Sequence, residues 1–154
     1  MVRDREPRPP SPERPLGHLL GRAHSRLTRM TAEALAPHGV DGHELTVLAV
    51  LADGEVLSQA GAAARLGVDR PTMVSLIDGP EDHALVERRR SPHDRRRNLV
   101  TLTPLGEKCL RQAERARRAA EQRFLAPLDE QTAAALRRAL RTLVPEERPP
   151  VPLP

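Results

Sequence analysis

Apolar residues recur along the chain with two different periods. Spacings of three and four residues predict amphipathic helices, and the clearest apolar stripe runs through Leu20, Ala23 and Leu27. The predicted helices cover residues 16–36, 41–52, 59–66, 70–79, 104–126 and 130–143. Between the fourth and fifth helices the period shortens to that of strands, at residues 85–88 and 98–102. The pattern predicts an α+β fold that is mainly α with a small β-hairpin.

Local signals mark the ends of these helices. Ser58 and Asp69 are the expected N-cap residues of the third and fourth helices. Gly61 stands where a capping box has a glutamate, so we expect the reciprocal bond to be missing there. Gly79-Pro80 predicts that the fourth helix ends or kinks near Gly79, because a proline removes a backbone donor and clashes with the preceding turn.

The two ends of the chain have the composition of disordered tails. Residues 1–15 and 145–154 each contain five prolines, and proline at that density blocks helix and sheet pairing. We therefore expect one folded domain at residues 16–144 of the 154.

The net charge of +4 is concentrated in one stretch. Residues 85–97 read LVERRRSPHDRRR and hold six of the 25 basic residues against two of the 21 acidic ones, so the remainder balances at 19 of each. A basic patch on an otherwise neutral chain predicts a polyanionic partner. The chain has no Trp, no Tyr and one Phe, which leaves little aromatic surface for stacking on unpaired bases and favours double-stranded DNA.

Several classes of function are disfavoured by the sequence. It has no glycine-rich phosphate loop, no nucleophile elbow and no carboxylate pair in a pocket-forming context, so we expect no enzyme activity. No His/Cys spacing suggests a metal site, and we expect no cofactor. No apolar run approaches the ~20 residues of a membrane span, and the single Cys109 cannot form an internal disulfide, so we expect a cytoplasmic protein.

The order of the predicted elements is that of a winged helix-turn-helix. Two short helices joined through Gly67 are followed at once by a hairpin with a basic tip. In such a lobe the second helix enters the major groove, and the hairpin reaches the neighbouring backbone or minor groove. The residues expected on the outward face of the second helix are Arg70, Pro71, Thr72, Val74 and Ser75.

Three segments together resemble the multiple antibiotic resistance regulator (MarR) family of bacterial transcription factors. They are Ser58–Asp78, Ala84–Glu107 and Phe124–Leu143, and the resemblance covers roughly residues 18–143. The middle segment is the most specific: it has a strand ending LVERR, a wing with a D-x-R motif, and a strand LVTLT that runs into a Pro-Leu-Gly helix start.

The resemblance implies a homodimeric transcriptional regulator with long dimerisation helices. Residues 16–36 and 104–144 would interlock with those of a second copy, and two winged lobes at 41–103 would read a near-palindromic operator. It also implies a repressor that a small-molecule effector can release. The long apolar stripes on the first and last helices independently favour a partner, because exposing apolar surface costs ~25 cal/mol per Å².

The family's wing motif matches Asp94 and Arg96. The resemblance places Arg96 in the minor groove and gives Asp94 the task of orienting a wing arginine by a charge-assisted bond. The other arginines of the hairpin are expected phosphate contacts, which steepen salt dependence without adding sequence preference. They are Arg95 and Arg97, together with Arg88, Arg89 and Arg90 if the end of that strand faces DNA.

Three departures from the family pattern weaken the predicted recognition helix. Ser75 replaces a longer, often basic residue, and Gly61 and Gly79-Pro80 replace better helix formers. We expect the wing to carry more of the affinity for that reason.

The sequence indicates less about an effector than about DNA binding. Family members often respond to phenolic or other anionic molecules bound where the dimer helices meet the winged lobe, and the aromatic walls common in such pockets are nearly absent here. Polar candidates for effector contacts are His18, Arg22, His24 and His43, although a lone histidine on a helix is more often solvated. Cys109 lies on an apolar stripe, which favours a buried structural thiol over an oxidant sensor.

Two alternatives stay open at this point. An architectural, non-specific double-stranded DNA-binding protein without an effector would use the same wing charge. A winged-helix module for protein interaction would have no DNA affinity, and the wing arginines disfavour it.

Overall fold

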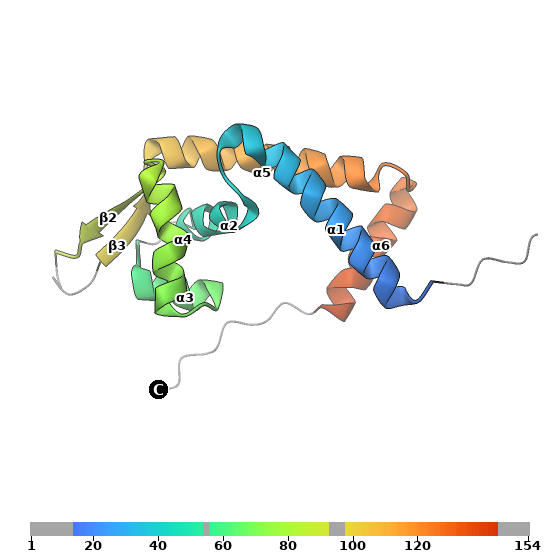
Figure 1. Ribbon diagram of the computed structural model, residues 1–154, viewed down its shortest axis with the longest axis horizontal. Coiled ribbons are helices and arrows are strands. Elements are labelled where there is room, and N and C mark those ends of the chain that lie inside the picture. Colours follow the sequence, from blue (N-terminus) through green and yellow to red (C-terminus); the bar gives the residue numbers. More distant parts are fainter. Residues whose placement is uncertain (1–13, 54–55, 93–97, 145–154) are drawn as a thin grey trace, which may run out of the picture.

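A computed structural model of the chain describes residues 14–53, 56–92 and 98–144. Most of the described chain is helical, and a small antiparallel sheet completes it, which confirms the expected fold class (Figure 1). The helices are α1 Leu16–Leu35, the 3₁₀ turn η1 Ala36–His38, α2 Gly42–Leu51, α3 Gln59–Leu66, α4 Arg70–Asp82, α5 Pro104–Leu125 and α6 Glu130–Leu143. The strands are β1 Leu57–Ser58, β2 Val86–Arg90 and β3 Asn98–Leu102.

The sheet has the order β1-β3-β2. β2 and β3 form the expected hairpin, antiparallel from the pair Val86–Leu102 to the pair Arg90–Asn98. β1 is a strand that the sequence pattern did not predict, and it pairs Leu57 with Val100 on the other edge of β3. Only the cap of α3 was expected at this point in the chain, because two residues are too few for an alternating pattern.

The molecule is elongated, with a winged lobe at one end. α2, α3, α4 and the sheet make up this lobe, while α1 and α6 lie at the opposite end, and α5 runs between the two (Figure 1). The hydrophobic core sits in the lobe, where Leu48, Met73, Ile77 and Val100 are almost completely buried. Of α6, only Ala133 is buried.

A Schellman motif closes α4 beyond Pro80, so the expectation that this helix ends near Gly79 is wrong. The helix continues through Pro80 to Asp82. Leu85 N–H donates to Pro80 O at 2.8 Å and Ala84 N–H donates to Glu81 O at 2.8 Å, which is the bond pair of that motif. The Pro80 side chain is fully buried, and its burial offsets the lost backbone bond.

The Schellman motif places Ala84 in the left-handed region, with φ at 55°. Among the described residues with positive φ, Ala84 is the one that is not a glycine; the others are Gly39 and Gly67. The motif sets the angle at which β2 leaves the helix, and so positions the wing.

A close backbone approach joins the lobe to α5. A Cβ at Gly106 would lie 1.9 Å from Leu85 O, so only glycine fits there. Thr103 caps α5, and its hydroxyl accepts from Gly106 N–H at 3.0 Å and donates to Ala84 O at 2.7 Å. The turn after α4 and the start of α5 are therefore held together as one unit.

The N-cap of α3 was predicted from the sequence, whereas the capping box of α2 was not. Ser58 accepts a bond from Gly61 N–H at 3.1 Å, so the first half of the cap is present without its glutamate. A full capping box, not anticipated, opens α2: Asp41 accepts from Glu44 N–H, and the Glu44 carboxylate accepts from Asp41 N–H.

Candidate nucleic-acid interface

The second helix of the helix-turn-helix is α4, and its outward face is open to solvent. Asp69 caps it by accepting a bond from Thr72 N–H at 2.8 Å. All the predicted contact residues in this helix are exposed: Arg70, Pro71, Thr72, Val74 and Ser75. Met73 and Ile77 point the other way and are buried in the core, so the helix is fixed to the lobe by one face and free on the other.

Two residues with hydroxyl side chains on this face, Thr72 and Ser75, take part in bonds within this part of the chain. Ser75 Oγ donates to Pro71 O at 3.3 Å, across one turn of the helix. Hydrogen bonds from the Thr72 side chain and backbone N–H lower the pKa of Asp69. Both residues therefore make bonds to the first turn of α4 or to its cap while they remain exposed to solvent.

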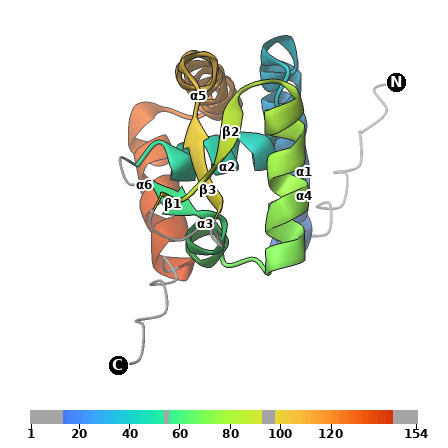
Figure 2. The same ribbon diagram turned by 90° about the vertical axis from the view of Figure 1, so that its left-hand side faces the viewer.

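The wing strand β2 runs beside α4 and is tied to it by Arg88 (Figure 2). The Arg88 guanidinium pairs with Asp78, and its Nε lies 3.3 Å from Glu81 Oε2, an ion-pair contact without hydrogen-bond alignment. It also donates to Val74 O at 3.4 Å. The side chain is only 24% exposed, so this arginine faces the helix.

The next two arginines of β2 differ from Arg88. Arg89 pairs with Glu87 at 2.7 Å and remains 71% exposed. Arg90, the last residue of the strand, is exposed. The wing-tip residues singled out from the sequence, Asp94, Arg95, Arg96 and Arg97, lie outside the described residues.

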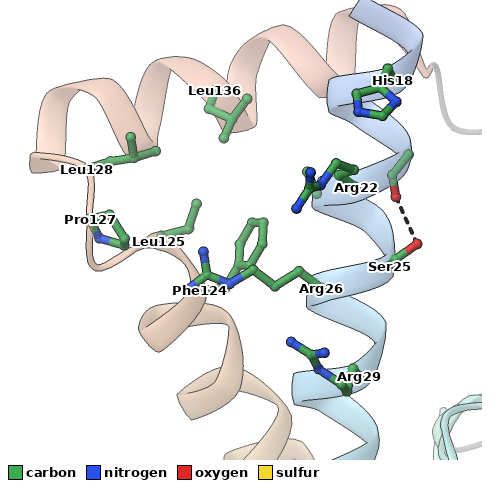
Figure 3. Close-up of a pocket in the computed structure, with 12 residues that line it drawn as sticks. His18, Arg22, Ser25, Arg26, Arg29, Phe124, Leu125, Pro127, Leu128 and Leu136 are labelled. Carbon is green, nitrogen blue, oxygen red and sulfur yellow. Dashed lines mark hydrogen bonds between the residues drawn. The ribbon is translucent and has the colours of Figure 1, made fainter. Parts of the chain in front are cut away.

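A surface pocket of about 780 Å³ lies between α1, the end of α5 and α6 (Figure 3). His18 and Arg22, two of the predicted effector contacts, line it together with Arg26 and Arg29. The opposite wall is largely apolar and consists of Phe124, Leu125, Pro127, Leu128 and Leu136. This pocket lies at the end of the molecule away from the winged lobe, whereas the hypothesis placed it next to the lobe (Figure 1).

His24 and His43 do not line this pocket. His24 is exposed on α1, and His43 is exposed in the first turn of α2. Sequence reasoning missed Arg26, whose guanidinium lies over the Phe124 ring at 5.8 Å from the centroid. The signal was present in the sequence, since Arg22, Arg26 and Arg29 are four and three residues apart and share one helix face.

Cys109 is buried in the face that α5 turns toward the core. Its Sγ donates to His38 O at 3.6 Å. Burial raises the pKa of the thiol, and the nearby Glu44 carboxylate raises it further. Among the described residues no group of three His, Cys, Asp or Glu side chains is placed to hold a metal ion. No helix in residues 14–53, 56–92 and 98–144 has the length and apolar character to cross a membrane.

Comparisons with known proteins identify the family. A MarR-family sequence profile matches residues 38–97. The HTH-type transcriptional repressor Rv2887 of Mycobacterium tuberculosis is 33% identical over 129 residues, which are 84% of this chain and 93% of that protein. A transcriptional regulatory protein assigned to the hcr operon of Thauera aromatica is 35% identical over 103 residues, 67% of this chain and 59% of that relative's length.

Solved structures agree with the sequence comparison. Rv2887 in complex with DNA has a TM-score of 0.70 at 30% identity, with 85% of this chain and 98% of that chain covered. The repressor CouR bound to a 23-mer DNA duplex has a TM-score of 0.74 at 30% identity, with 84% and 92% covered. With a winged helix-turn-helix lobe joined to long terminal helices, and with relatives of this identity and coverage, the chain belongs to the MarR family of transcriptional regulators.

Proposed function

We propose that this protein is a homodimeric, sequence-specific repressor that binds double-stranded DNA at a near-palindromic operator. It acts by occupying a promoter rather than by catalysis, and it works in the cytoplasm, where a bacterial regulator reaches the chromosome. The names of its relatives support repression, since Rv2887 and CouR are both called repressors and both have been solved with DNA.

The observation that carries the proposal is the pairing of two features on the lobe. The open face of α4 lies beside the basic strand β2, which ends in the exposed Arg90 (Figure 2). A helix for the major groove and a neighbouring cationic strand for the backbone are the two contacts a winged helix makes with a duplex.

In this proposal α4 supplies the base contacts and the wing supplies charge. Arg89, Arg90, Arg95 and Arg97 contact phosphates, and Arg96, oriented by Asp94, enters the minor groove. The helix contacts come from Arg70, Pro71, Thr72, Val74 and Ser75. Arg88 is the exception among the hairpin arginines, because its ion pairs with α4 give it a positioning role.

Dimerisation is proposed through the terminal helices. Several large apolar residues there are exposed in the single chain, with Leu16 at 69% and Leu143 at 71%. The others are Leu19, Leu20 and Leu140. Covering them with a second copy removes apolar surface from water and brings two α4 helices onto one operator.

An anionic effector with an apolar body suits the pocket beside α1. Arg22, Arg26 and Arg29 offer three guanidinium groups opposite the apolar wall of Phe124 and Leu136. CouR of Rhodococcus jostii RHA1 has been solved with p-coumaroyl-CoA, an anionic ligand with an aromatic part, which supports this class of effector. His24 and His43 stand apart from this pocket and have no part in the proposal.

Selection of duplexes from a random library by the full chain tests the proposal. We expect enrichment of an inverted repeat, and tighter binding to that repeat than to random DNA at fixed salt by a factor of about 10³ or more. A ratio near one would instead establish the architectural alternative. Sedimentation of the protein–DNA complex should give two chains per duplex, and one chain per duplex would contradict the dimer.

A further inference from the structure

Val74 is an apolar residue in the middle of the face that α4 presents to DNA. It is 41% exposed, although it is a large hydrophobic residue, and Pro71, one turn earlier, is exposed beside it. A β-branched residue at an exposed helix position lowers helix propensity relative to alanine, so Val74 gives this helix no local advantage. The side chain is therefore available to contact whatever binds this face of α4.

The surroundings of Val74 indicate what it contacts. Ser75 Oγ donates to Pro71 O at 3.3 Å and Thr72 N–H donates to the Asp69 cap, so both polar residues next to Val74 also make bonds within this part of the chain. The strongest free polar group on the face is the exposed Arg70 guanidinium at the start of the helix. The face therefore combines an apolar centre with a cationic edge.

DNA offers one apolar group in the major groove, the 5-methyl group of thymine. A valine or proline side chain can pack on that methyl, whereas cytosine presents an amino donor and no methyl at the corresponding edge. The basic surroundings, with Arg70 on the helix and Arg89 and Arg90 on the adjacent strand, complement a duplex and would repel a basic partner.

We propose that Val74, together with Pro71, reads thymine methyl groups in the major groove and is the main source of base preference in α4. This inference rests on the proposed DNA-binding function and adds the chemistry of its readout. It implies half-sites with thymine at one or two positions facing the middle of α4, where the contact is a methyl group and not a hydrogen bond.

The test removes methyl groups from the DNA. Duplexes selected from a random library by the full chain are remade with deoxyuridine replacing thymidine one position at a time, which deletes the methyl and keeps the base pair. For the wild-type protein we expect affinity to fall about fourfold for each contacted methyl, and about fifteenfold when both half-sites are changed, from the value of one buried carbon group. Fluorescence anisotropy at fixed salt measures both.

Substitutions at Val74 test whether this side chain is the one that contacts the thymine methyl group. Val74→Ala should bind the thymidine duplex more weakly and lose the response to deoxyuridine, while Val74→Thr, which keeps one methyl group and the shape, should retain part of it. Val56→Ala is the matched control, because Val56 is 63% exposed and lies outside α4, and it should respond as the wild type does.

The outcomes separate this inference from the proposed function. If a sequence is enriched but no deoxyuridine position weakens wild-type binding, or if Val74→Ala keeps the full response, the methyl readout is wrong and sequence-specific binding stands. If the selection enriches no sequence, both fail.

Discussion

Replacing Arg88 with alanine should destabilise the fold without removing a phosphate contact. The guanidinium pairs with Asp78 and Glu81 on α4 and donates to Val74 O, and its side chain is 24% exposed. Exposed ion pairs contribute about 0.2–1 kcal/mol each, and a partly buried pair lies near the upper end. Removing the arginine also leaves two carboxylates three residues apart on the helix.

The sum of these effects is about 1–2 kcal/mol of unfolding free energy. For a domain of this size that lowers Tm by about 5 °C. Denaturant unfolding at fixed protein concentration measures the free energy, since the stability of a dimer depends on concentration. A double-mutant cycle with Asp78→Ala should give a coupling energy of about 0.5–1 kcal/mol.

Arg90→Ala is the matched control, because Arg90 is an exposed arginine on the same strand. It should leave Tm unchanged and reduce the slope of log K against log salt by about 0.9 for each phosphate that the protein no longer neutralises, or about 1.8 for the dimer. Arg88→Ala should leave that slope unchanged. If Arg88→Ala instead lowers the salt slope as Arg90→Ala does and leaves Tm unaltered, then Arg88 is a phosphate contact and the positioning argument is refuted.

Three further experiments test single positions in the fold, at Ala84, Gly106 and Cys109. Ala84→Gly should stabilise the protein by about 0.5–1 kcal/mol, because relief of the left-handed backbone outweighs the added chain entropy, and an unchanged or lower Tm would count against strain at this site. Gly106→Ala should cost about 3 kcal/mol, since its Cβ would meet Leu85 O at 1.9 Å, and a variant as stable as the wild type would disprove the close approach. Cys109 should react slowly with iodoacetamide at pH 8 in the folded protein and rapidly in denaturant, because burial raises its pKa, and fast labelling of the native protein would contradict this.

Local capping signals explain which parts of the fold the sequence could predict. Ser58, Asp69 and Thr103 each accept a bond from a backbone N–H three residues on, and the helices that follow them begin where expected. These bonds form within one turn, so the residues that determine them are adjacent in the sequence. The β2–β3 hairpin is similarly local and was predicted for the same reason.

β1 and the extension of α4, which the sequence did not predict, depend on residues outside the element itself. β1 exists because Leu57 pairs with Val100 across the sheet, which no two-residue pattern can indicate. The extended end of α4 is closed by Leu85 N–H, which donates to Pro80 O where the chain turns at Ala84 toward β2. A proline that would break an isolated helix is tolerated here because backbone N–H groups after the helix bond to the carbonyls of its last turn.

A count of charges does not distinguish the roles of the arginines in the basic cluster at residues 85–97. By charge alone, its six arginines are equal candidates for contact with a polyanion. In the described part of the cluster, Arg88 is held by two carboxylates of α4, Arg89 pairs with Glu87, and Arg90 is exposed at the end of the strand. The charge that is free to meet a phosphate therefore increases along the strand toward the wing tip, while the base of the strand fixes the angle between wing and helix. Because that angle decides whether both elements reach one duplex, Arg88, the least exposed arginine of β2, contributes to the interface by tying the wing to α4.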